Sequence, residues 1–209
     1  MNGVLNIFKP KGMSSFDAVR VVKKVAGTGK VGHTGTLDPE ATGVLPICIG
    51  RATKIIDYIM DSEKVYEVTL KLGIRTTTYD LEGEVLEERD PSHLTEEEIL
   101  NSINSFKGEY SQIPPMYSAL KQNGVRLYEL ARKGIEVERK GRLINIHNLE
   151  DIKINNPYIS MKVTCSKGTY IRSLCYDIGE KLGVFATMTQ LNRAKTSVFS
   201  QEKSININE

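Results

Sequence analysis

The 209-residue sequence lacks the cysteine patterns that mark metal-binding and disulfide-rich proteins. Its three cysteines, Cys48, Cys165 and Cys175, are widely spaced, and no CxxC pair or Cys/His ligand spacing occurs. This pattern suggests neither a zinc site nor a disulfide framework. Each thiol is expected to be a small core residue in a reducing compartment, and no metal ion is predicted.

Long apolar runs, repeats and linkers are also missing. No segment approaches the ~18 apolar residues of a membrane span, and residues 1–8 lack the apolar centre of a signal peptide. We therefore expect a cytoplasmic protein without membrane contact. Without low-complexity tracts or Pro/Ser-rich linkers, one compact domain over residues 1–209 is the simplest organisation.

The sequence has little excess charge of either sign. It contains 28 Lys and Arg against 26 Asp and Glu, a net charge of +2. Such a weakly basic chain permits nucleic-acid binding but is not evidence for it. Any phosphate-binding surface must therefore come from clustering of the basic residues.

Helix and strand signals alternate along the chain. Ser14 with Asp17, and Thr95 with Glu98, form capping boxes that predict helix starts. Strands and helices in irregular succession favour an α+β fold with a mixed, mainly antiparallel sheet flanked by helices and loops. The expected strands are 4–8, 44–49, 65–70, 84–88, 143–149, 152–154 and 158–165, and the expected helices are 14–26, 52–60, 95–107, 127–133 and 169–182.

The most informative segment is glycine-dense and runs from Lys30 to Leu45. Glycine allows close approach of another molecule and torsions that other residues resist. Asp38 stands within it, between Leu37 and Pro39. A lone Asp-Pro pair usually starts a turn, but a carboxylate in such a loop is better placed to act on a ligand than to support a core.

This segment, GHTGTLDPEATGVL at residues 32–45, resembles the GHxGxLDPxATGxL block of the TruB-type pseudouridine synthases, which isomerise one uridine in transfer RNA. The resemblance implies that Asp38 is the essential nucleophile, and a carboxylate suits attack on the substrate or stabilisation of charge at the sugar. His33 matches the position that wedges into the RNA when the uridine leaves its stack. Its alternative is a histidine hydrogen-bonded within the loop.

A second block, CSKGTYIRSL at residues 165–174, resembles the family's CSxGTYIRxL segment. By this resemblance Arg172 pairs with Asp38, and Tyr170 lines the same pocket. Tyr66 matches the catalytic-site tyrosine that stacks on the target base, and Leu191 matches a leucine that packs against it. The ordinary alternatives are a strand tyrosine for Tyr66 and a solvated surface charge for Arg172.

Weaker matches extend the resemblance over nearly the whole chain. They are KPKGMSS at 9–15, in which Ser15 replaces the usual Thr, GIRTTTYD at 73–80, and PPMYSALK at 114–121 followed by Tyr128 and Arg132. The resemblance implies the pseudouridine-synthase fold, no cofactor, a monomer, and tRNA bound through its T-arm stem-loop, with the uridine at conventional position 55 as substrate. Candidate phosphate contacts, which position RNA without reading its sequence, are Lys9, Lys11, Lys64, Lys121, Arg132 and Arg193.

The sequence departs from the family pattern after Arg193. Members commonly continue into a small C-terminal RNA-binding (PUA) domain, and the tail from Ser204 to Glu209 is too short to form one. No PUA domain is therefore expected.

Two other classes of function are compatible with the sequence. A tRNA-binding folding chaperone would flip and grip the T-loop without essential catalysis. A hydrolytic glycosidase typically needs two positioned carboxylates, and only Asp38 has a ligand-facing context, with Asp80 a poor second.

Overall fold

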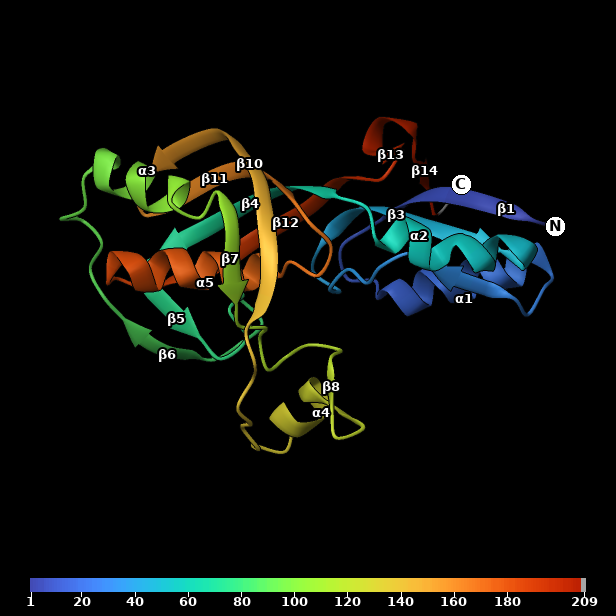
Figure 1. The fold of residues 1–209 in the computed structure, drawn as a ribbon, viewed down its shortest axis with the longest axis horizontal. Helices are drawn as coiled ribbons and strands as arrows, with labels where there is room; N and C mark the ends of the chain where they lie inside the picture. The colour runs from blue at the N-terminus through green and yellow to red at the C-terminus, as the bar shows by residue number, and fades with distance from the viewer. Residues whose placement is uncertain (208–209) are drawn as a thin grey trace. The chain divides into compact units, whose positions relative to one another are not determined.

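The computed structural model describes residues 1–207 and divides into two compact units (Figure 1). Unit 1 comprises Met1–Glu67, Lys162–Lys167 and Gln190–Glu209, and unit 2 comprises Val68–Met161 and Gly168–Thr189. The last two residues of the tail, 208–209, lie outside the described residues. Three strands have residues in both units: β4 (Lys64–Leu72), β11 (Tyr158–Cys165) and β12 (Ala186–Thr196). The expectation of one domain without a PUA domain stays a prediction.

Unit 1 is organised around β3 (Thr42–Ile49), whose residues from Gly43 to Ile49 are all buried. This strand pairs antiparallel with β1 (Gly3–Lys9) and with the short β2 (Val31–His33), and parallel with β12. Two short strands complete the unit, β13 (Phe199–Ser200) and β14 (Ile205–Asn206). The predicted strands 4–8 and 44–49 are confirmed.

Helix α1 (Ser15–Ala26) begins at the predicted capping box and ends at Gly27, which takes the left-handed conformation. Only half of the apolar residues that recur at helical spacing in this segment face the core. Val19 and Val22 are buried, but Phe16 and Val25 are exposed, because Ser15 and Ala18 occupy the buried face instead.

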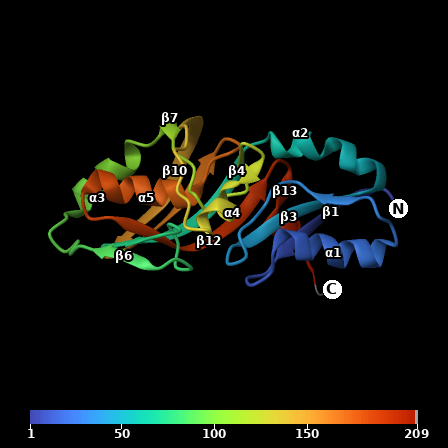
Figure 2. The same ribbon diagram turned by 90° about the horizontal axis from the view of Figure 1, so that it is seen from below.

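The helix predicted at 52–60 is wrong in part. Residues Gly50–Ile55 form a 3₁₀ turn, η1, and only Ile56–Met60 form an α-helix, α2. A second 3₁₀ turn, η2 (Gln201–Lys203), lies near the C-terminus. Figure 2 shows α1 and α2 on opposite sides of β1 and β3, so helices flank both faces of these strands.

In unit 2, β10 (Arg142–Asn155) lies between β11 and β7 (Gly108–Gln112). The two strands predicted at 143–149 and 152–154 are one strand, in which Asp151 has a positive φ instead of starting a turn. The strands expected at 65–70 and 84–88 do not form a hairpin with each other, since β6 (Val85–Glu88) pairs with β5 (Ile74–Thr76). The strand expected at 65–70 is confirmed as part of β4, whose residues alternate between a buried face and a partly exposed one.

Three helices belong to unit 2. α3 (Glu96–Asn104) starts at its predicted capping box, ends earlier than expected, and packs against α5 (Ile171–Leu182), as Figure 1 also shows. α4 (Leu127–Ala131) follows the small hairpin β8 (Lys121–Gln122) and β9 (Val125–Arg126). α5 starts two residues later than predicted and ends at left-handed Gly183.

The whole is an α+β fold with a mixed sheet, as predicted. Strand β12 was not predicted, although it carries Leu191 and Arg193. Within residues 1–207, no helix has the length and apolar character needed to cross a membrane.

Candidate functional site

The loop that carries Asp38 is fixed from α1 by one serine. Ser15 Oγ accepts a hydrogen bond from the Leu37 backbone N–H at 2.8 Å and lies 3.1 Å from the Leu37 carbonyl oxygen, to which it donates. The Leu37 side chain is buried, and the Ala41 N–H donates to the Asp38 carbonyl at 3.1 Å. The backbone of Asp38 is therefore held on both sides while its residue stays partly exposed.

Lys9 holds the same loop from β1. Its side chain is fully buried, and Nζ donates to the carbonyl oxygens of Met13 at 2.6 Å, Pro10 at 2.9 Å and Pro39 at 3.1 Å. Burial lowers the pKa of Lys9 to about 8, against the opposing effect of the Asp38 carboxylate. Lys9 therefore binds the turn that follows Asp38.

Arg193 is the third donor to this loop. Its side chain is 1% exposed, and the guanidinium donates to the carbonyls of Val44 at 2.8 Å and Gly35 at 3.0 Å. Arg193 lies opposite Gly43 in the β3–β12 register, where a Cβ on Gly43 would stand 2.3 Å from the Arg193 carbonyl oxygen. Glycine at position 43 is thus required for β12 to approach.

Tyr66 and Lys64 lie on the buried face of β4 within unit 1. Tyr66 is 9% exposed, and burial raises the pKa of its phenol while neighbouring Arg193 opposes the rise. Lys64 Nζ donates to the carbonyls of Met60 and Ser62, and burial lowers its pKa to about 8.

The buried cations argue against part of the expected phosphate contact. Lys9, Lys64 and Arg193 direct their donors to backbone carbonyls inside unit 1, so the role that the structure indicates for them is support of the loop and of β4.

The other basic candidates are exposed. Lys121 and Arg132 lie around the small hairpin and α4. Exposed Lys11 pairs with Glu40 at 3.0 Å.

His33 and Leu191 are both partly exposed in unit 1. Nδ1 of His33 accepts a hydrogen bond from the Gly35 N–H at 3.2 Å, which is the loop contact considered as its alternative role. Burial, with Arg193 nearby, lowers the pKa of His33, so the imidazole is neutral near pH 7.

In unit 2, Arg172 on the first turn of α5 is 6% exposed, which excludes a solvated surface charge. The guanidinium lies 3.6 Å from the Asp80 carboxylate and donates to the carbonyls of Thr78 at 3.1 Å and Tyr117 at 2.9 Å. Asp80, itself 8% exposed, also accepts from the Glu82 N–H at 3.0 Å. The charge of Arg172 is thus balanced inside its own unit.

Asp80 is the residue that sequence reasoning undervalued. Its signal was the TxTxD spacing, because Thr76 Oγ1 donates to the Asp80 carbonyl at 2.7 Å and Thr78 Oγ1 donates to its carboxylate. Asp38 belongs to unit 1 and Arg172 to unit 2, and their pairing stays a prediction. Tyr170 ends the loop before α5, and Gln112 on β7 contacts its backbone.

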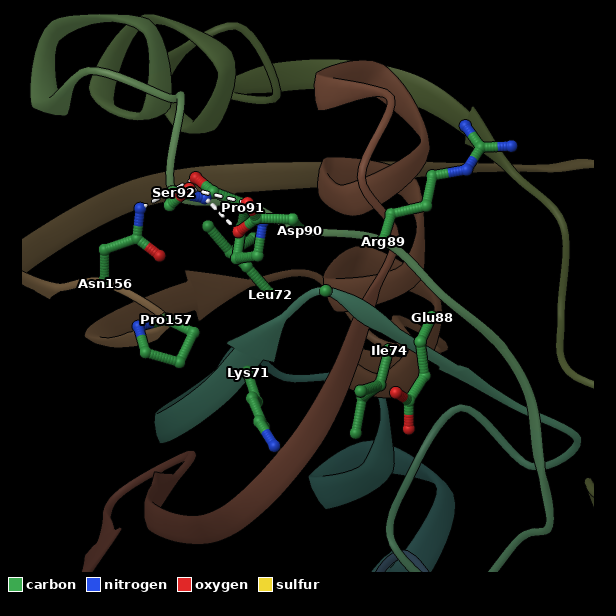
Figure 3. Close-up of a pocket in the computed structure, with 11 residues that line it drawn as sticks. Lys71, Leu72, Ile74, Glu88, Arg89, Asp90, Pro91, Ser92, Asn156 and Pro157 are labelled. Atoms are coloured by element: carbon green, nitrogen blue, oxygen red, sulfur yellow. Dashed lines mark hydrogen bonds between the residues drawn. The ribbon is translucent and has the colours of Figure 1, made fainter.

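Unit 2 also has an open pocket of about 750 Å³ lined by residues of β4, β5, β6 and the following loop (Figure 3). Asn156 donates to the Pro91 carbonyl at its edge. None of the candidate site residues lines it. In residues 1–207, no group of three or more His, Cys, Asp or Glu side chains is arranged to hold a metal ion.

Solved structures define the class of protein. The chain resembles a chain of "Crystal Structure of a Cbf5-Nop10-Gar1 Complex", with a TM-score of 0.76 and 30% identity, over 99% of this chain and 52% of that one. A structure described as "Crystal structure of pseudouridylate synthase" matches with a TM-score of 0.50 at 17% identity, over 99% of this chain and 68% of the other. The fold is that of the pseudouridine synthases. The chain spans about half the length of the first of these solved chains.

Sequence comparison gives the family. Residues 23–171 match the TruB family pseudouridylate synthase (N terminal domain), and residues 172–209 match the tRNA pseudouridylate synthase B C-terminal domain. A "tRNA pseudouridine synthase B" of Clostridium perfringens is 67% identical over 99% of this chain and 71% of its own length. One of Alkaliphilus oremlandii is 53% identical over all of this chain and 70% of its own length. The chain belongs to the TruB family.

Proposed function

We propose that this TruB-family tRNA pseudouridine synthase acts on the uridine of the T-arm loop, at conventional position 55, with Asp38 as its nucleophile. The observation that carries the proposal is a partly exposed carboxylate on a loop fixed by buried donors. Ser15 and Lys9 hold the backbone on either side of Asp38. A reacting group held in this way loses little freedom when substrate binds.

The chemistry suits a single carboxylate without a cofactor. The N1–C1′ bond breaks, the base turns, C5 bonds to C1′ and loses its proton, and N1 gains a proton. The product is an isomer, so no external energy is needed. Asp38 adds covalently to the substrate in one step and is released in a later one.

Aromatic and apolar side chains would form the pocket for the flipped base. Tyr66 stacks on the uracil, Tyr170 and Leu191 line the pocket, and Arg172 directs the carboxylate of Asp38. His33, neutral near pH 7, fills the gap that the uridine leaves in the RNA.

The RNA backbone would be held by exposed cations. Lys11, Lys121 and Arg132 are the accessible members of the predicted set. We further propose that the protein is a cytoplasmic monomer.

Tritium release from tRNA labelled with [5-³H]uridine tests the proposal. Wild type should release tritium, and Asp38→Asn should release it on the order of 10⁴-fold more slowly or not at all, the scale seen when a reacting residue is removed. Both proteins should bind tRNA equally, because the substitution is isosteric on a partly exposed side chain.

The matched substrate control changes the T-loop uridine to cytidine, which should abolish release by wild type. Full release by Asp38→Asn would contradict the role of Asp38. Binding without release by wild type would favour the folding-chaperone alternative, and release of free uracil would indicate a glycosidase.

A further inference from the structure

The residue that precedes α5, Tyr170, is held by a glutamine of β7. Gln112 Oε1 accepts from the Tyr170 backbone N–H at 2.8 Å, and Gln112 Nε2 donates to the Tyr170 carbonyl oxygen at 3.1 Å. One side-chain amide therefore pairs with both backbone groups of one residue, as a neighbouring strand would. The next residue of the loop, Ile113, accepts from Ser173 Oγ at 2.9 Å through its carbonyl.

This clamp replaces a feature that α5 lacks. Helices usually begin at Ser, Thr, Asp or Asn, whose side chain bonds an N–H group of the first turn. The residue at this position of α5 is Tyr170, which makes no such side-chain hydrogen bond. The direction in which the chain enters α5, and with it the placement of Tyr170 and Arg172, is therefore set from outside the helix.

Gln112 is itself held firmly. It is 2% exposed, and Nε2 also donates to the Tyr110 hydroxyl at 2.7 Å. That hydroxyl lies 3.4 Å from the Asp177 carboxylate, to which it donates. Asp177 is on α5, two turns beyond Tyr170, so the hydrogen bonds run from the start of the helix through β7 and back to the same helix. Such a closed network of buried and partly buried polar groups fixes one geometry.

We propose that Gln112 is a positioning residue for pseudouridine formation. By clamping the Tyr170 backbone, it sets where the Tyr170 ring and the Arg172 guanidinium stand when the uridine is bound. The inference rests on the proposed function, since it needs Tyr170 and Arg172 to serve the substrate. Gln112 touches neither substrate nor reacting atoms, and it acts through these two residues.

The first test compares Gln112→Leu with wild type by steady-state tritium release. Leucine has a similar volume but removes all three hydrogen bonds. We expect kcat to fall about 10- to 100-fold, the effect of displacing aligned groups by about an ångström, while KM for tRNA stays within about threefold because phosphate contacts lie elsewhere. The matched control is Gln190→Leu, an exposed glutamine of β12 that should leave both constants unchanged.

The second test is Gln112→Glu, which changes the amide into a group that titrates. The ionised carboxylate accepts from the Tyr170 N–H but sets its second oxygen against the Tyr170 carbonyl, whereas the protonated acid can donate to that carbonyl. Burial favours the protonated form. The ratio of kcat for Gln112→Glu to kcat for wild type should therefore be higher at about pH 6 than at about pH 8. The same ratio for Gln112→Leu should not change with pH.

Charged neighbours are present in every variant, and the ratio for Gln112→Leu measures their effect when no titrating group stands at position 112. They are Asp177, whose pKa burial raises to about 6, Glu180 further along α5, and Arg142, which lies opposite Gln112 in the β7–β10 register. Tyr110, whose pKa burial raises, stays protonated throughout.

The outcomes separate the inference from the function on which it rests. A wild type that releases no tritium contradicts the proposed function, whatever the variants do. An active wild type overturns the positioning role if Gln112→Leu keeps its kcat per folded molecule, or if Gln112→Glu follows the pH profile of wild type. Circular dichroism of each variant gives the folded fraction, so a loss of folding is not mistaken for a loss of kcat.

Discussion

The two units hold their candidate residues by different physical means. In unit 1, the loop around Asp38 is bound by buried cations, Lys9 and Arg193, whose donors go to backbone carbonyls. In unit 2, Arg172 is balanced by the carboxylate of Asp80, and the start of its helix is bound by the amide of Gln112. Carbonyl oxygens leave the charge of a cation unneutralised, whereas a carboxylate cancels it.

The difference appears in the charge of the units as well. Unit 1 has 14 Lys and Arg against 9 Asp and Glu, and unit 2 has 14 against 17, so their formal charges are +5 and −3. A weakly basic whole thus conceals one basic and one acidic unit. Field strength at a polyanion depends on this local distribution more than on the net charge of +2.

Breaking the ion pair of unit 2 should have the largest effect on stability. Asp80→Asn keeps the shape of the side chain but leaves the buried Arg172 charge uncompensated. We expect a loss of about 3–5 kcal/mol in the free energy of unfolding, the range for removal of one partner from a buried pair. Urea denaturation measures it. A loss below about 1 kcal/mol would mean that the carbonyls of Thr78 and Tyr117 suffice for Arg172.

A second difference between the units should appear in the pH dependence of stability, through the buried Lys9 of unit 1. Its pKa falls from an ordinary value of 10.5 to about 8 in the folded protein. Between these values the unfolded chain retains the proton that the folded chain has lost, so stability rises with pH, by at most about 1.4 kcal/mol per pH unit.

The variant that tests this rise is Lys9→Met, which lacks the contribution of Lys9 to the increase of stability with pH. Lys64, whose pKa is also lowered to about 8, retains its own share in both proteins. Denaturation from pH 7 to pH 10.5 compares the two slopes, over a range that starts below the pKa of Lys9 and ends at its ordinary value. Equal slopes for wild type and Lys9→Met would contradict the assignment.

The smallest effect is expected from the exposed ion pair of unit 1. Glu40→Gln removes the partner of Lys11, and both side chains are largely in water. We expect a change below about 1 kcal/mol, reduced further by added salt. This variant is the control for Asp80→Asn, since both convert a paired carboxylate to an amide. A larger loss of stability for Glu40→Gln than for Asp80→Asn would contradict the expected order of the two ion pairs.

Much of the fold could be predicted because its signals are local. The capping boxes at Ser14 and Thr95, and the alternation of β4, each depend on residues a few positions apart. Left-handed Gly27 and Gly183 end their helices for the same reason. Motif resemblance likewise identified the loop of Asp38 and the turn of Arg172.

What could not be predicted depends on distant partners. Strand β12 is a strand because it pairs with β3, about 150 positions earlier, and the burial of Arg193 follows from that pairing. Lysines are usually exposed. Lys9 and Lys64 are buried because backbone carbonyls from several segments accept hydrogen bonds from their Nζ atoms. The role of Asp80 could not be predicted because its ion-pair partner, Arg172, is 92 positions away in the sequence.

The division of the chain among the units also fixes an order of events in its biosynthesis. The loop with Asp38 is translated well before Arg193, which binds it and belongs to the last of the three segments of unit 1. Unit 2 has all its residues once position 189 has left the ribosome, whereas unit 1 still lacks its part of β12 and the strands β13 and β14. The nascent enzyme therefore acquires its proposed nucleophile before Arg193, a residue that fixes the loop, has been translated.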